Sequence, residues 1–495
     1  MKGFNLKIII HILGLLLLFN AVFMGLVTLC SYFFDDGATS GLLTALAINV
    51  AAGGIFMGLT LNHRKEIKKR EGYIIVTLGW ITMVFFGMLP FVFTNSMTTI
   101  SDAFFETMSG YTATGATILG DIEALPKSII LWRSLTHWMG GMGIIVLAIA
   151  ILPLLGIGGM QLFSAEAPVL GGDKLHPRIS DTAKRLWLIY VSLTFVNALL
   201  LYLSGMSLFD AVNHAMSTMA SGGFSSKNES LGYWNDLPQI QYITVFFMFL
   251  AGSNFVLLYY ALKGKFNRVF ADNEFRWYTG FIGIFVLIVS ISLFRNGLYA
   301  AADLPMWTAV EHSFRHALFQ VVAVITTTGL VTADFTAWSP FVTMLFFGLM
   351  FLGGSTGSTS GGVKVMRHLI LIKNGFLEFK RALHPNAILM VRLNKAPIEQ
   401  SIVYHVLAFF VLYMILFIIG AGVLSVLGLD FTTAIGGAAA SLGNVGPGLG
   451  GVGPASTYAA LPVLGKLWCA LLMLIGRLEL FTVLILFSPY YWSKN

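Results

Sequence analysis

Four short polar segments, each with a glycine near its end, interrupt a largely apolar chain. They read "DAFFETMSGYTATGAT" from Asp102, "DAVNHAMSTMASGGFS" from Asp210, "HALFQVVAVITTTGLV" from His316 and "TAIGGAAASLGNVGPG" from Thr433. Twelve or thirteen residues after each start stands a glycine, and the separations of 107, 107 and 117 residues are those between Gly115, Gly222, Gly329 and Gly446. A pattern that recurs four times at near-constant spacing indicates an internal repeat rather than four ordinary turns.

The chemistry that such segments suit is the dehydration of a monovalent cation. Backbone carbonyl oxygens that converge on one axis replace the water shell of the ion without a net charge that would trap it. Glycine permits backbone conformations that a Cβ atom would penalise, so carbonyl groups can point inward at close quarters. A helix that enters the membrane from outside also places its partly negative carboxyl end at mid-membrane, where it favours a cation.

The composition indicates that these segments lie within a membrane. Of the 495 residues, 57% are hydrophobic and only 11% are charged, and the mean hydropathy is +0.81. About 20 apolar residues cross the roughly 30 Å hydrocarbon layer as a helix. Runs of that length predict ten spans near residues 5–32, 40–61, 73–94, 131–156, 186–204, 238–262, 277–294, 338–372 (interrupted), 402–427 and 460–487.

This order predicts an all-α polytopic membrane protein with four span-pore-span repeats in fourfold pseudo-symmetry. The short helices, of roughly 10 to 13 residues, cannot cross the bilayer and are expected to be re-entrant. Non-helical backbone at that depth must be buried in protein or line a wet cavity. The predicted units are an N-terminal helix pair (1–72), pore repeat 1 (73–183), repeat 2 (184–275), repeat 3 (276–399) and repeat 4 (400–495).

The basic residues predict the orientation of the chain. Of the 30 Lys and Arg, 23 fall on one side of the predicted path, including the "HRKEIKKRE" loop and the run from Lys373 to Lys395. By the positive-inside rule that side is cytoplasmic, and so are both termini. The net charge of +7 is therefore explained by topology, and no nucleic-acid partner is needed.

Several motifs resemble the Trk/Ktr/HKT superfamily of potassium transporters, and in it the membrane subunit of bacterial Trk systems. They are "DAFFETMSGYTATGAT", "HWMGGMGIIVLAIAILPLLGIGGMQLF", "GGSTGSTSGGVKVMR", "HPNAI", "NVGPGLG" and "GRLELFTVLILFSP", and the similarity covers nearly the whole chain. The resemblance implies potassium uptake across a bacterial cytoplasmic (inner) membrane. A serine in place of the first-repeat glycine goes with sodium transport in this superfamily, so Gly115 favours potassium.

The resemblance also implies which residues form a selectivity filter. In each repeat these are the glycine and the backbone just before it. Carried over to this chain, they are Ala113, Thr114, Gly115, Ala220, Ser221, Gly222, Thr327, Thr328, Gly329, Asn444, Val445 and Gly446.

Small and polar residues interrupt the predicted second span of repeat 3 at "FLGGSTGSTSGGVK", residues 351–364. The stretch fails as a phosphate loop, because "GVK" replaces the required Gly-Lys-Ser/Thr and no strand precedes it. A flexible break in a membrane helix must be buried or water-lined. With the resemblance, this favours a gating loop beneath the filter over a passive kink; its residues are Gly353, Gly354, Ser355, Thr356, Gly357, Ser358, Thr359, Ser360, Gly361 and Gly362.

Arg477 lies inside the last predicted span, where a charge is expensive and usually faces a cavity or a partner. The resemblance favours a place in the inner half of the pore, where the guanidinium repels cations until the gate rearranges. The alternative is a structural role, through pairing with Glu479 or another acid or through snorkelling to the interface. Residues 477 and 479 do not share a helix face, which weakens that pair.

Partners are implied by the resemblance alone. They are a second copy of the chain, in a homodimer, and a cytosolic regulatory subunit of the TrkA type that binds NAD and adenine nucleotides. "DNEFRWY" from Asp272 and the basic run 373–395 are expected to be solvated loops, or else to dock that regulator. Potassium is the transported ion, and no organic cofactor is expected in this chain.

Two other functional classes fit less well. A proton- or sodium-coupled cation symporter would more typically carry carboxylates in its spans and show inverted repeats, whereas these repeats run in one sense. A membrane enzyme would need a catalytic set, and the chain has no HExxH, Gly-x-Ser-x-Gly or metal-ligand spacing. The histidines near the pore segments, His137, His214 and His316, are expected to pack or cap rather than to bind ligands.

Overall fold

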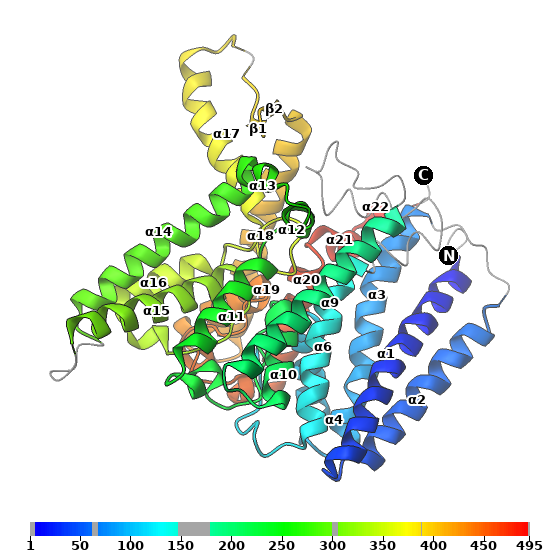
Figure 1. The fold of residues 1–495 in the computed structure, drawn as a ribbon. Helices are drawn as coiled ribbons and strands as arrows, with labels where there is room; N and C mark the ends of the chain where they lie inside the picture. Colours follow the sequence, from blue (N-terminus) through cyan, green and yellow to red (C-terminus); the bar gives the residue numbers. More distant parts are fainter. Residues whose placement is uncertain (1–4, 62–67, 147–178, 299–304, 388, 494–495) are drawn as a thin grey trace.

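The computed structural model describes residues 5–61, 68–146, 179–298, 305–387 and 389–493, and helices make up most of it (Figure 1). The first part of the chain contains α1 (Leu6–Phe34), α2 (Thr39–Gly58), α3 (Lys69–Gly87), α4 (Leu89–Phe93), α5 (Ile100–Tyr111), α6 (Lys127–Val146), α9 (Ile179–Leu203) and α10 (Leu208–Met219). The middle part contains α11 (Pro238–Ala251), α12 (Phe255–Leu262), α13 (Phe266–Ala271), α14 (Asn273–Arg295), α15 (Met306–Ile325), α16 (Pro340–Leu349) and α17 (Val365–Leu383). The last part contains the two-residue strands β1 (Arg392–Leu393) and β2 (Ala396–Pro397), then α18 (Gln400–Val426), α19 (Phe431–Gly443), α20 (Val463–Arg477), α21 (Phe481–Leu484) and α22 (Pro489–Trp492).

Six helical stretches are long and apolar enough to cross a membrane, and they coincide with six of the predicted spans: Leu6–Phe34, Thr39–Gly58, Arg70–Phe93, Lys184–Leu203, Asn273–Arg295 and Gln400–Val426. Two sharply bent helix pairs raise the number to eight if each pair is one span. The bend is 108° between α11 and α12 and 109° between Val463–Arg477 and Phe481–Phe487. The total of ten remains a prediction, because residues 147–156 of the fourth predicted span lie outside the described residues.

The predicted span 338–372 is not one helix. It consists of the ten-residue helix α16, a non-helical segment and α17. The segment contains the glycines and hydroxyl residues that predicted a break. Glycine is a poor helix former, and hydroxyl side chains compete for backbone hydrogen bonds, so the break has a local cause.

The four expected pore helices are α5, α10, α15 and α19, with 12, 12, 20 and 13 residues. The third is longer than the expected 10 to 13 residues. Its extra turns carry Glu311 and Arg315, which are four residues apart and form an ion pair at 2.9 Å. An ion pair at this spacing stabilises a helix. The helix α15 therefore begins before the apolar residues from which the shorter length was predicted.

A buried polar network joins the N-terminal helices to the first pore helix. The Asn20 amide on α1 donates to Asn49 on α2 at 3.1 Å, and the Tyr111 hydroxyl at the end of α5 donates to Asn20 at 2.6 Å. Side-chain hydrogen bonds of this kind hold membrane helices together where the hydrophobic effect cannot. The N-terminal pair is thus attached to the first of the expected pore helices, and α1 also lies beside α3 and α6 (Figure 1).

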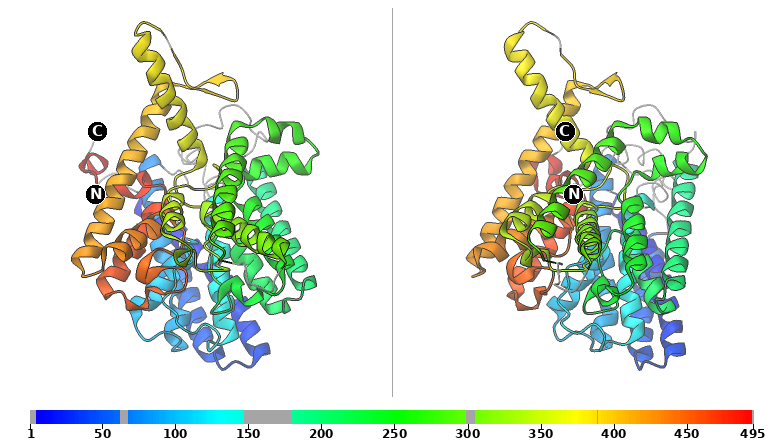
Figure 2. Two further views of the ribbon diagram at one scale, coloured as in Figure 1. Left: turned by 90° about the vertical axis from the view of Figure 1, so that its left-hand side faces the viewer. Right: turned by 60° about the vertical axis from the view of Figure 1, so that its left-hand side comes forward.

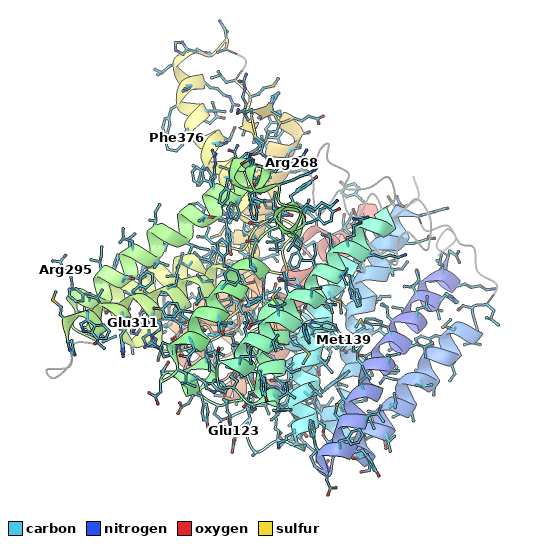
Figure 3. The ribbon with its side chains drawn as sticks, in the orientation of Figure 1. Glu123, Met139, Arg268, Arg295, Glu311 and Phe376 are labelled. Atoms are coloured by element: carbon cyan, nitrogen blue, oxygen red, sulfur yellow. The ribbon has the colours of Figure 1, made fainter. Side chains whose placement is uncertain are left out.

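The beginning and the end of the described chain meet at one end of the molecule. The Asn5 backbone donates to Glu71 at 2.8 Å, and the neighbouring Arg70 donates to the Ser493 carbonyl at 2.8 Å. The α17 helix and the β1–β2 hairpin project from that end (Figures 1 and 2). Arg268, beside them, and Glu123 lie at opposite ends of the molecule (Figure 3).

Candidate functional site

The four short helices end in the same way. Within two residues of each helix end stands a residue with a positive φ, between 50° and 55°, and these residues are Ala113, Ser221, Thr327 and Asn444. The next amide donates to a carbonyl five residues upstream in every case: Thr114 to Ser109, Gly222 to Ser217, Thr328 to Ala323 and Val445 to Ala440, at 2.8 to 2.9 Å. A left-handed residue followed by such a bond is the Schellman ending of a helix. The equivalence of the four segments is therefore a property of their backbone.

A second positive φ follows two residues after the first, and in each segment it falls on a glycine. The φ angles are 83° at Gly115, 88° at Gly223, 65° at Gly329 and 95° at Gly446. The left-handed region penalises a Cβ atom, so glycine is the residue that this position requires.

The register predicted for the second segment is therefore wrong by one residue. The residues equivalent to Ala113, Thr114 and Gly115 are Ser221, Gly222 and Gly223, and the predicted set began at Ala220. Ala220 lies a step earlier, as the cap of α10. The cause is the double glycine, because sequence spacing cannot tell which of two adjacent glycines takes the left-handed conformation.

The four segments contact one another in a closed cyclic order. A methyl group on Gly115 would place its carbon 2.2 Å from the Gly222 carbonyl oxygen, and one on Gly223 would lie 2.4 Å from that of Thr328. On Gly329 it would lie 2.1 Å from the Val445 oxygen, and on Gly446 it would lie 2.5 Å from the Thr114 oxygen. Each glycine thus packs on the residue that precedes the glycine of the next segment, and the fourth segment returns to the first.

A cavity of about 320 Å³ adjoins this ring. Its lining includes all four left-handed glycines, Gly115, Gly223, Gly329 and Gly446, together with residues that follow them in the chain. Lys227 also lines it and pairs with Glu123 at 2.9 Å, so the cavity lies toward the Glu123 end of the molecule. In the part of the chain that the structure describes, no group of three or more His, Cys, Asp or Glu could hold a metal ion.

Hydroxyl and amide groups form hydrogen bonds within and between the segments beside the ring. The Thr112 and Thr114 hydroxyls are 2.7 Å apart, and the equivalent Thr326 and Thr328 hydroxyls are 2.8 Å apart. The Asn444 amide donates to the Thr114 hydroxyl at 3.0 Å and so joins the fourth segment to the first. Tyr458 braces the same seam, because its hydroxyl donates to the Gly446 carbonyl at 2.9 Å and its amide to that of Thr117 at 2.8 Å.

The broken segment between α16 and α17 lies against this ring on the side away from the cavity. The Gly361 amide donates to the Thr327 hydroxyl at 2.7 Å, and the Thr359 and Ser221 hydroxyls are 2.9 Å apart. Gly361 also packs closely on Asn444, since a methyl group there would lie 2.7 Å from the Asn444 Cβ. Most of the segment is buried, with Gly357 exposed. Three of the four pore segments are therefore in direct contact with it.

Arg477 is buried at the end of α20 and contacts this segment. Its guanidinium donates to the Thr359 carbonyl at 2.7 Å and to the Gly140 carbonyl at 3.0 Å. The alternative partner, Glu479, instead pairs with Arg367 on α17. Residues 479 and 480 have positive φ, and the chain turns sharply there. Within the last predicted span, the helix α20 therefore ends at Arg477.

Glu274 is a residue that the sequence did not single out. It was expected in a solvated loop but is 2% exposed, and its carboxylate accepts from the Thr356 amide at 2.7 Å and the Met366 amide at 3.2 Å. It therefore holds both the broken segment and the start of α17. The sequence carried one signal, because Asp272 is a helix-capping residue two positions earlier and places Glu274 in the first turn of α14.

The three histidines are buried among packing partners, as expected. His137 stacks on Phe224 with ring centroids 3.9 Å apart, and His214 lies 2.9 Å from the Ser225 hydroxyl. His316 lies 3.2 Å from the Thr332 hydroxyl. Each therefore supports a segment that follows a pore glycine.

Fold and site together define a class: helical membrane proteins in which four helices deliver glycine-bearing backbone to the edge of one cavity. The chain belongs to the TrkH family of cation transport proteins, whose model matches residues 41–494. The resemblance inferred from the motifs is thereby confirmed.

Individual relatives match along their whole length. The chain is 40% identical to the Trk system potassium uptake protein TrkH of Salmonella typhimurium over 493 residues, which covers 99% of this chain and 100% of the relative. It is 39% identical to the TrkH protein of Halomonas elongata, again over 99% of this chain and 100% of the relative. The crystal structure of the potassium transporter TrkH from Vibrio parahaemolyticus superposes with a TM-score of 0.89 at 37% identity, covering 99% of this chain and 100% of that one.

Proposed function

We propose that this protein takes up potassium across a bacterial cytoplasmic membrane through a carbonyl-lined filter. The observation that carries the proposal is the closed cycle of four segments, in which Gly115, Gly223, Gly329 and Gly446 share one left-handed conformation at one cavity. Family membership supports potassium as the transported ion, because the named relatives are potassium uptake proteins.

The filter consists of the three residues that end at each left-handed glycine. In the first, third and fourth segments these are the predicted residues, and in the second they are Ser221, Gly222 and Gly223. Backbone oxygens replace the hydration shell of the ion without fixed negative charge, so binding stays weak enough for the ion to leave. The supporting geometry is the recurrence in every segment of two left-handed residues separated by one other residue.

The gate, in this proposal, is the segment 353–362 together with Arg477. The segment contacts three of the pore segments and would block a path that leads away from the cavity. The buried guanidinium adds a positive charge beside Thr359, and an unscreened charge in a low-dielectric interior raises the energy of a nearby cation. Conduction therefore requires the segment and Arg477 to move together, since a hydrogen bond of 2.7 Å joins them.

Assembly and orientation complete the proposal. Both termini face the cytoplasm, as the distribution of Lys and Arg predicts. The family favours a homodimer and a cytosolic nucleotide-binding regulator of the TrkA type. The helix α17 and the β1–β2 hairpin, which project from the end where the termini meet, are the part of the chain best placed for such a regulator.

Cation uptake into proteoliposomes that contain this chain alone tests the proposal. A potassium gradient is imposed at clamped voltage, without a proton or sodium gradient. Potassium uptake that follows its electrochemical gradient and exceeds sodium uptake is the expected result. Uptake that appears only when a proton or sodium gradient is added would instead establish a coupled symporter, and uptake that appears only with the cytosolic regulator would place control of the gate in that partner.

A further inference from the structure

A buried ion pair between α5 and α6 lies beside the ring of pore glycines. The Glu106 side chain is 0% exposed and that of Arg133 is 1% exposed. Two guanidinium nitrogens of Arg133 donate to the same Glu106 oxygen, Nε at 3.0 Å and Nη2 at 2.7 Å. Removing two charges from water is costly unless further hydrogen bonds satisfy them. Both members of this pair make such bonds, and these bonds reach the pore segments.

The Glu106 carboxylate holds the first pore segment just past its glycine. One oxygen accepts from the Thr117 hydroxyl at 2.9 Å, and the other accepts from the Ile118 amide at 3.0 Å. The carboxylate thus fixes the chain two and three residues after Gly115.

The Arg133 guanidinium holds the second pore segment at the equivalent place. Its Nη1 atom donates to the Ser225 carbonyl at 3.2 Å, and its Cζ atom lies 4.2 Å from the centre of the Phe224 ring. His137, one helical turn further along α6, stacks on the same ring at 3.9 Å with an interplanar angle of 15°. Phe224, which follows Gly223 directly, therefore packs against two side chains of α6.

We infer that Glu106 and Arg133 are positioning residues that couple the first and second pore segments and thereby set the preference of the pore for potassium over sodium. The inference rests on the proposed function. Neither residue needs to touch the ion: the pair acts by holding the backbone that follows Gly115 and Gly223 at one separation. Arg133, Phe224, Ser225 and Thr117 all line the cavity at this seam, which places the device beside the ion path.

Another buried ion pair offers a matched comparison. Lys466 on α20 and Asp102 on α5 are 2.7 Å apart, with side chains 9% and 11% exposed. This pair joins two helices and makes no hydrogen bond to a residue that follows a pore glycine among the contacts of the described chain. Loss of either pair removes a buried ion pair from α5, but loss of Glu106–Arg133 alone releases the two segments.

The test compares two double variants in proteoliposomes, Glu106→Gln with Arg133→Gln and Asp102→Asn with Lys466→Gln. Each removes both charges, so neither leaves an uncompensated buried charge. The ratio of potassium to sodium uptake should fall about tenfold in the first variant, the discrimination that one to two hydrogen bonds carry, and should stay at the native value in the second. An unchanged ratio in the first variant, or an equal fall in both, would overturn the inference.

A conservative variant keeps the test decisive if the first double variant does not insert in the membrane. Arg133→Lys retains the charge opposite Glu106 but cannot donate to Glu106 and Ser225 with a planar fork, so the same loss of preference is expected. A native ratio in Arg133→Lys would overturn the inference. Failure of the proposed function is separately visible, because the unmodified chain would then take up no potassium down its gradient, with or without the cytosolic regulator.

Discussion

At the scale of single residues, the site depends on glycines that are required for different structural reasons. Gly223 has a φ of 88° and packs on the Thr328 carbonyl, so both its conformation and its neighbour exclude a side chain. Gly222 has an ordinary φ, but a methyl group there would lie 2.2 Å from the His137 Nδ1 atom. The adjacent glycines are needed for separate reasons, one for backbone conformation and the other for space.

Replacing Gly115 by serine should weaken discrimination between potassium and sodium. The side chain would meet the Gly222 carbonyl at 2.2 Å and would have to adopt a φ of 83°, so the ring must widen. We expect the ratio of potassium to sodium uptake to fall by roughly tenfold, which corresponds to a change of about 1.4 kcal/mol. Gly120→Ser is the control, because a methyl group at Gly120 meets nothing within 4 Å. A native ratio in Gly115→Ser would contradict the filter assignment.

A second substitution can distinguish the requirement for space at Gly222 from the requirement for backbone conformation at Gly223. Gly222→Ala should lower the free energy of unfolding by about 1–3 kcal/mol, the usual cost of overpacking. His137→Ala should recover much of that loss, because it removes the ring that the new methyl group meets. Gly223→Ala should not be rescued by His137→Ala, since its obstacle is the Thr328 backbone. Thermal unfolding in detergent measures the effects, and equal rescue of both variants would refute the register.

At the scale of elements, the broken segment between α16 and α17 is held by contacts from several helices. Glu274 at the start of α14 accepts from amides on both sides of residues 357–364, and Arg477 at the end of α20 donates to Thr359. The segment has few repeating backbone hydrogen bonds of its own, apart from a bridge between Leu352 and Val363. Its position is therefore set by its neighbours, and a change in those helices would move it.

Removing the Arg477 side chain should raise basal potassium uptake. Arg477→Ala deletes both the positive charge and the donor to the Thr359 carbonyl, so the barrier to a cation falls and the segment loses a tether. We expect uptake through the chain alone to rise several-fold, roughly the effect of one charge-assisted hydrogen bond. Arg295→Ala, which changes an exposed arginine at the end of α14, is the control. Reduced uptake with normal membrane insertion would indicate a structural role.

At the scale of the whole molecule, the cavity and the broken segment lie on opposite sides of the glycine ring. The cavity lies toward Glu123, whereas Arg268 lies toward the end from which α17 projects (Figures 1 and 3). The two ends of the molecule therefore differ, with the ring of glycines between the cavity and the broken segment, and in the proposed function this ring is the filter and the broken segment the gate. The distribution of Lys and Arg predicts which of the two ends faces the cytoplasm.

Thiol labelling tests that orientation. In a background with Cys30→Ser and Cys469→Ala, which removes both native cysteines, a single cysteine is introduced by Glu123→Cys or by Arg268→Cys. A membrane-impermeant maleimide should label Glu123→Cys in intact cells and Arg268→Cys only after permeabilisation. Labelling in the opposite sense would invert the proposed topology while leaving the fold unchanged.

The amino-acid sequence by itself determined the class of the protein and most of its candidate site. Hydropathy located the apolar helices because lipid imposes one length on any spanning segment. Three of the four left-handed glycines could be placed because each of those segments offers one glycine shortly after its helix, and the requirement for positive φ is local. The break at residues 353–362 was also evident, since glycine and hydroxyl residues disfavour helix wherever they occur.

Tertiary structure alone decided what depends on distant partners. The choice of Gly223 over Gly222 follows from where α10 ends, because the Gly222 amide donates to the Ser217 carbonyl and the left-handed glycine comes next. The pairing of Glu479 with Arg367 rather than Arg477 follows from the turn after α20. Arg477 and Gly140 are 337 positions apart, and Asn444 and Thr114 are 330 apart. Residue type and local spacing carry no record of such contacts, because the packing of helices that are distant in the sequence determines which of many suitable polar groups come within hydrogen-bonding distance.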